Sequence, residues 1–89
     1  MEAKLLNLAE ALKVYAIVGK AIEEFDSIPG ALLSLTSDEF IQCAEIMLGK
    51  TKEELAKEDN WSIVETTIAG VEQNMISELA TVVKYLGVK

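Results

Sequence analysis

The chain has 89 residues, of which 51% are apolar, and carries a formal net charge of −7. This length sets a single domain over residues 1–89 with one modest core, and the apolar fraction excludes an intrinsically disordered chain. The negative charge opposes nucleic-acid phosphates and anionic lipid headgroups, so we expect neither a nucleic-acid partner nor a membrane partner.

Cysteine content and the N-terminal sequence bear on where the protein works. Cys43 is the single cysteine, so no intrachain disulfide can form. Secreted domains of this size often depend on disulfides, so we expect a cytoplasmic protein. The N-terminus lacks the continuous apolar region of a signal peptide. No apolar run approaches the roughly 18 residues that a membrane span needs.

A long first helix is predicted over residues 3–25. Apolar side chains recur there at three- and four-residue steps, typical of a helix face that packs on a core: Leu5, Leu8, Leu12, Tyr15 or Ala16, Val18 or Gly19, and Ile22. Charged residues fall mostly on the other side. Residues 26–30 then interrupt the pattern. Asp26 or Ser27 can cap a following helix and Pro29 suits its first position, which predicts a short helical turn over residues 29–35.

Three capping boxes predict the later helix starts. In each, a serine or threonine is followed three residues later by glutamate, so that side chain and backbone can satisfy each other: Thr36–Glu39, Thr51–Glu54 and Ser62–Glu65. The first predicts a helix over residues 37–48 that stops at Gly49. The second predicts a short helix over residues 52–57. The third predicts a long last helix over residues 63–86, ending at Gly87.

The predicted last helix carries a nearly heptad apolar seam, in steps of three and four residues: Val64, Ile68, Val71, Met75, Leu79, Val82 and Leu86. Such a helix can pack within its own chain or against a copy of itself, giving a homo-oligomer. Trp61, just before this helix, is predicted to pack on a neighbouring helix or to anchor a partner. The candidate protein-interaction surface is therefore Trp61, Met75, Leu79, Val82 and Leu86, with a contribution from the first helix.

Together these elements predict an all-α fold. We expect a small irregular bundle of four to five helices, with long first and last helices and short ones between them.

Few residues in the chain could support catalysis. Histidine is absent, which removes the commonest general base and metal ligand. Cys43 has no histidine to activate it and is expected to be a buried, inert thiol. Carboxylates gather mostly at predicted helix starts, where they stabilise the helix dipole. We therefore expect no enzyme activity, no cofactor and no metal.

Two stretches, residues 35–40 (LTSDEF) and 48–55 (LGKTKEEL), together with the opening helix over residues 5–22, carry a family resemblance. They resemble tail assembly chaperones of long-tailed bacteriophages, especially the short acidic type from phages and prophages of Gram-positive hosts. The resemblance implies a helical protein of the host cytoplasm that binds the tape measure protein and keeps it soluble before the tail tube forms. Many such chaperones also exist in a longer, frameshifted form, and the resemblance implies that this chain corresponds to the short one. No site residue is carried over.

Two other classes of protein fit the size and charge. A small acidic regulator, such as an antitoxin, an inhibitor or a DNA mimic, is one. An acyl-carrier-like protein is the other, because Asp26-Ser27-Ile28 resembles the serine attachment site of acyl carriers. Pro29-Gly30 departs from the carrier pattern, which continues into a long acidic helix.

Overall fold

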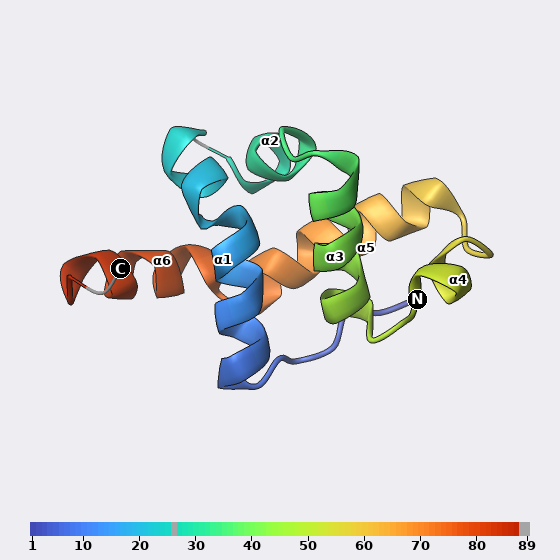
Figure 1. Ribbon diagram of the computed structural model, residues 1–89, viewed down its shortest axis with the longest axis horizontal. Helices are drawn as coiled ribbons and strands as arrows, with labels where there is room; N and C mark the ends of the chain where they lie inside the picture. Colours follow the sequence, from blue (N-terminus) through green and yellow to red (C-terminus); the bar gives the residue numbers. More distant parts are fainter. Residues whose placement is uncertain (26, 88–89) are drawn as a thin grey trace.

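The computed structural model describes residues 1–25 and 27–87. Within these ranges the chain forms six helices and no strand, which confirms the all-α prediction (Figure 1). The helices are α1 (Leu8–Glu24), α2 (Ile28–Leu33), α3 (Ser37–Leu48), α4 (Lys52–Leu55), α5 (Asn60–Gln73) and α6 (Ile76–Tyr85).

The first helix begins five residues later than predicted. Asn7 is its N-cap: the Asn7 side chain accepts a hydrogen bond from the Glu10 amide (2.9 Å), and the Glu10 carboxylate accepts one from the Asn7 amide (3.2 Å). Asparagine caps helices as well as serine does, so this box fixes the start. The residues before it cross the end of α3, where the Lys4 amide donates to the Met47 carbonyl (3.0 Å).

The face of α1 that packs on the core also differs from the prediction. Val14 and Val18 are fully buried, whereas Leu8 and Leu12 are exposed, as is Leu5 ahead of the helix. The helix is apolar on more than one side, so its periodicity did not single out one face. Valines on the buried side have short, branched side chains that fit between closely packed helices.

Two of the three predicted capping boxes are confirmed. Thr36 caps α3 and Thr51 caps α4, each bonded reciprocally with the glutamate three residues on, and α3 ends at Gly49 with a left-handed φ of 64°. The box predicted at Ser62 is wrong. Asp59 caps α5 instead, because its carboxylate accepts from both the amide (2.9 Å) and the hydroxyl (3.2 Å) of Ser62.

The two short helices, α2 and α4, form where they were predicted, but their first or last residues differ from the prediction. Ser27 caps α2, accepting from the Gly30 amide (3.1 Å), so the helix covers residues 28–33 rather than 29–35. Asp26, the alternative cap, lies outside the described residues. Helix α4 ends at Leu55, two residues before the predicted end.

The predicted last helix forms two helices, α5 and α6, so the prediction of one continuous apolar seam along it is wrong. Met75 has a left-handed backbone (φ 56°) between α5 and α6. The preceding Asn74 side chain accepts from the Leu6 amide (2.8 Å) and donates to the carbonyls of Lys4 (3.0 Å) and Gly70 (2.9 Å). The break is therefore fixed by the extended N-terminal segment, which is distant in sequence.

The core lies where α1 and α3 cross α5 and α6, with α2 covering one end (Figure 1). Its fully buried side chains come from five helices: Val14, Val18, Leu32, Cys43, Met47, Val71 and Ile76. At Gly70, α5 lies close to α3 and to the N-terminal segment, because an added Cβ there would lie 2.6 Å from Met47 Sδ and 2.7 Å from the Ala3 Cβ. This crossing places α6 against α1 and leaves its outer side to solvent.

Candidate functional site

The five predicted interaction residues do not form one surface. Trp61 lies in the first turn of α5, whereas Met75, Leu79, Val82 and Leu86 lie in or next to α6, at the other end of a molecule 40 Å long (Figure 1). Trp61 is 67% exposed, so it does not pack under a neighbouring helix as its position suggested. Leu79 is half-buried, and the other three are exposed.

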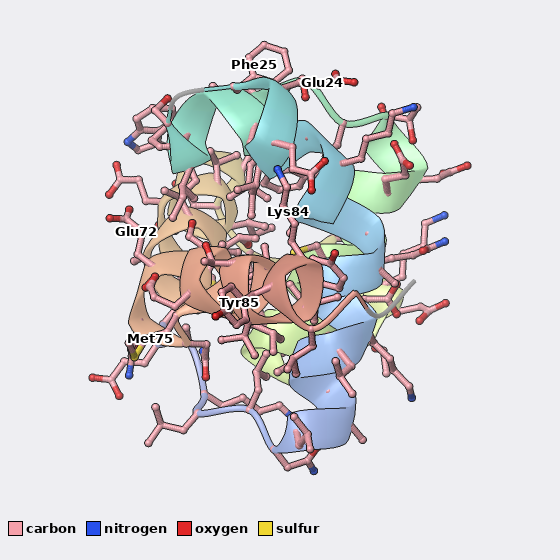
Figure 2. The ribbon with its side chains drawn as sticks, turned by 90° about the vertical axis from the view of Figure 1, so that its left-hand side faces the viewer. Glu24, Phe25, Glu72, Met75, Lys84 and Tyr85 are labelled. Atoms are coloured by element: carbon pink, nitrogen blue, oxygen red, sulfur yellow. The ribbon has the colours of Figure 1, made fainter. Side chains whose placement is uncertain are left out.

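Helix α6 divides into a buried side and an exposed apolar side. Ile76 and Ala80 are buried in its contact with α1. The opposite side shows Val82, Tyr85 and Leu86, spaced as neighbours on one helix face. In Figure 2, Tyr85 occupies the middle of this exposed end of the molecule and Met75 its margin. We call Met75, Val82, Tyr85 and Leu86 the α6 surface.

Tyr85 is the residue of the α6 surface that sequence reasoning missed. It is 89% exposed, the highest value among the large apolar and aromatic side chains of the described residues. Its signal was present in the sequence: it lies three residues after Val82, on the same face. The heptad assignment omitted it because the step after Val82 was assigned to Leu86.

A second apolar site lies between α2, α3 and α5. It is a pocket of about 320 Å³, which we call the α2–α3–α5 pocket, lined by Leu32, Leu33, Leu35, Thr36, Ser37, Phe40, Ile41 and Val64. Leu33 at its rim is 66% exposed. Trp61 lies one turn before Val64 on α5, so both share a helix side. The sequence did not predict this pocket, since it depends on how three helices meet.

Two larger depressions lie elsewhere on the surface. One, of about 440 Å³, lies between the N-terminal residues and α5, with Glu2, Glu65 and Gln73 among its lining. The other, of about 410 Å³, lies between α1 and α3, with Ala16, Ile17 and Ile46. Both are open to solvent, as is the α2–α3–α5 pocket. Within the described residues no group of three or more histidine, cysteine, aspartate or glutamate side chains is placed to hold a metal ion.

The ionisable groups with shifted pKa values serve the fold. Burial raises the pKa of the Cys43 thiol to about 12, so it stays protonated near neutral pH, and Cys43 lies in the core as predicted. A hydrogen bond from the Lys4 ammonium lowers the pKa of Glu10. A hydrogen bond from the Thr51 backbone amide lowers that of Glu54. Both carboxylates stabilise helix starts rather than converge on a site.

Ser27, the residue of the acyl-carrier hypothesis, caps a helix of only six residues. Its hydroxyl oxygen accepts from the Gly30 amide (3.1 Å), and Pro29 occupies the first turn. The long acidic helix of the carrier pattern does not follow it.

Among the described residues, none of the helices combines the length and the hydropathy of a membrane-spanning segment. Comparisons of the chain with protein-family models, curated proteins and solved structures found no match. Function is therefore inferred from the two apolar surfaces, and the resemblance to phage tail assembly chaperones stays a prediction.

Proposed function

We propose that this protein is a non-enzymatic, cytoplasmic tail assembly chaperone that binds a helical partner and keeps it soluble, the tape measure protein of a phage tail being that partner. The observation that carries the proposal is the α6 surface. Three large side chains stand on the outer face of a helix whose inner face already packs on α1. A contiguous group of apolar side chains open to solvent is typical of a protein-association site.

The spacing of these side chains suits a helix as the partner. Val82, Tyr85 and Leu86 lie at i, i+3 and i+4, the spacing with which one amphipathic helix packs on another. Capture of this kind needs no bond chemistry and is reversible, as a chaperone that leaves its client requires. The net charge of −7 supports solubility of the complex once the apolar stripes are covered.

Co-expression with a tape measure protein from a phage of a Gram-positive host tests the proposal. We expect the chain to raise the soluble fraction of that protein and to co-purify with it. Tyr85→Asp places a charge in the α6 surface and should abolish co-purification. Lys84→Gln makes the same change of net charge at an exposed position on another side of the same helix and should leave it intact.

Circular dichroism of both variants separates binding from folding, because neither side chain is buried. An insoluble tape measure protein in the presence of the native chain would count against chaperoning. Recovery of a toxin, a nuclease or a polymerase from the source cells would support the acidic-regulator alternative. Light scattering of the free chain tests self-association, which should decrease in Tyr85→Asp if copies meet through α6.

A further inference from the structure

The break between α5 and α6 is not explained by the residues that form it. Residues 71–86 contain neither glycine nor proline, the residues that most often end a helix. Within the described residues, Met75 is the one non-glycine residue with a positive φ, of 56°, a conformation that is sterically unfavourable for a side chain with a Cβ. Asparagine tolerates this conformation better, but Asn74 lies one position earlier. The local sequence therefore favours a helix that continues through residue 75.

The start of α6 also lacks the cap that a separate helix normally has. Each of the other five helices begins at a residue whose side chain accepts a backbone amide of the first turn. The N-cap of α6 is Met75, which makes no such bond. In a helix continuous with α5, the first-turn amides of α6 would instead bond to carbonyls four residues earlier. Joining α5 to α6 would therefore satisfy these amides.

Contacts with distant parts of the chain hold the break in place. The Asn74 side chain bonds to the Leu6 amide and the Lys4 carbonyl of the N-terminal segment. On the other side of the break, Ile76 and Ala80 are buried where α6 packs on α1. The broken form thus depends on two tertiary contacts that oppose the local preference for one helix.

A helical Met75 would separate α6 from α1 of its own chain. Its φ would change by about 120°, from 56° to the helical value, and α6 would then point in another direction. The buried face of α6 and the face of α1 that it covers would both be exposed, at the cost of the burial free energy. An identical α6 from a second copy has the side chains that fit the exposed face of α1, and the reverse holds for the second copy.

We infer that two copies of the chain exchange α6: α5 and α6 join into one helix through Met75, and α6 of each copy packs on α1 of the other. The exchanged dimer keeps the α1–α6 contact, relieves the left-handed backbone of Met75 and extends the helix hydrogen bonds across the break. Association opposes it entropically, so the dimer forms at high protein concentration. The inference is independent of the proposed function, because the exchange involves no client.

Light scattering over a range of protein concentration measures the dissociation constant of the dimer. Asn74→Ala removes bonds that hold the broken form and should lower this constant about tenfold. Met75→Gly relieves the broken form and weakens the continuous helix, so it should raise the constant about tenfold. Gln73→Ala and Glu72→Gly are the controls. Both positions are helical in either form, so the constant should stay within about twofold.

Tyr85→Asp separates exchange from contact through the α6 surface. Tyr85 is exposed on the outer face of α6, which the exchange does not use, so the dissociation constant should not change. A dimer lost in Tyr85→Asp but unaffected by Met75→Gly would overturn the inference. So would a native chain and an Asn74→Ala chain that are both monomeric at the highest soluble concentration.

Isotope-labelled cross-linking identifies which chain supplies the α6 packed on each α1. Lys84 of α6 and the α1 lysines, Lys13 and Lys20, react with an amine cross-linker, and Lys84 points toward α1 in Figure 2. Chains labelled with nitrogen-14 and nitrogen-15 are mixed in urea, refolded together, and the dimer is isolated and cross-linked. We expect about half of the links between Lys84 and α1 to join a light chain to a heavy one. Links that join only chains of the same mass would overturn the exchange.

Discussion

The crossing of α3 and α5 and the docking of α6 on α1 are both helix–helix contacts, but they use their apolar side chains differently. At the first, Gly70 lets α5 approach Met47 so closely that no Cβ fits between them, and Thr67 and Val71 on either side of it are fully buried. At the second, Ile76 and Ala80 are buried while Val82, Tyr85 and Leu86 remain open to solvent.

This difference separates the residues that determine stability from those available for binding. A side chain already surrounded by protein contributes its full transfer and packing energy to the fold. An apolar side chain in water contributes little until a partner covers it. Substitutions at the α3–α5 crossing should therefore act on unfolding, and substitutions on the α6 surface should act on association.

The largest effect is expected from Met47→Ala at the crossing. Met47 is fully buried, so truncation leaves a cavity and should lower the free energy of unfolding by about 2–5 kcal/mol. Val82→Ala on the exposed side of α6 should change it by less than about 0.5 kcal/mol. Urea denaturation followed by far-UV circular dichroism measures both. Similar values for the two would remove the distinction between the contacts.

Asn74→Ala tests the link between the two contacts. The substitution leaves the Leu6 amide and the Lys4 carbonyl without their side-chain partner, at a cost of about 1–3 kcal/mol. Gln73→Ala, one residue earlier and exposed, is the control and should stay within about 0.5 kcal/mol. Hydrogen exchange should also rise at the Leu6 amide in Asn74→Ala, and unchanged protection there would contradict the bonding described.

Comparing Gly70→Ala with Gly19→Ala separates the effect of close packing on stability from the effect of helix propensity. Both gain about 1 kcal/mol of propensity. At Gly70 the methyl group meets buried Met47 and Ala3, an overpacking of about 1–3 kcal/mol, so we expect a net loss of up to about 2 kcal/mol. At Gly19 it meets the Tyr15 ring, the end of a side chain that can rotate aside, so we expect a net gain of up to about 1 kcal/mol. Equal shifts in thermal midpoint would show that α3 and α5 are less closely packed.

Met75→Gly should have the smallest effect on stability and the opposite sign. Glycine adopts the left-handed backbone of residue 75 without steric cost, so unfolding should require about 0.5–1 kcal/mol more. Glu72→Gly, inside α5, should destabilise by a comparable amount. Because Met75 belongs to the α6 surface, Met75→Gly should also weaken partner capture while stabilising the fold, which a purely structural role of Met75 would not explain.

Sequence reasoning succeeded where the determinants are local. Thr36, Thr51 and Gly49 act within a few residues of themselves, so their helix boundaries could be predicted. The break at Met75 could not, because the bonds that accompany it join Asn74 to Lys4 and Leu6 across most of the chain. Leu8 and Leu12 were assigned to the core because α1 is apolar on several sides. Which side is buried depends on packing against the other helices, and that side holds Val14 and Val18.

The candidate sites follow the same division. Val82 and Leu86 could be named from a repeat along one helix. The pocket beside Leu33 required three helices to be placed first.

The hydrogen bonds of Asn74 have a practical consequence for work with this protein. They connect Leu6, which precedes α1, to the break between α5 and α6. An affinity tag or fluorescent fusion attached at Met1 would extend the same N-terminal segment whose Lys4 and Leu6 backbone groups bond to Asn74. We expect such an attachment to alter client capture even though α6 itself is untouched, so assays should compare N-terminally labelled protein with the tag-free chain.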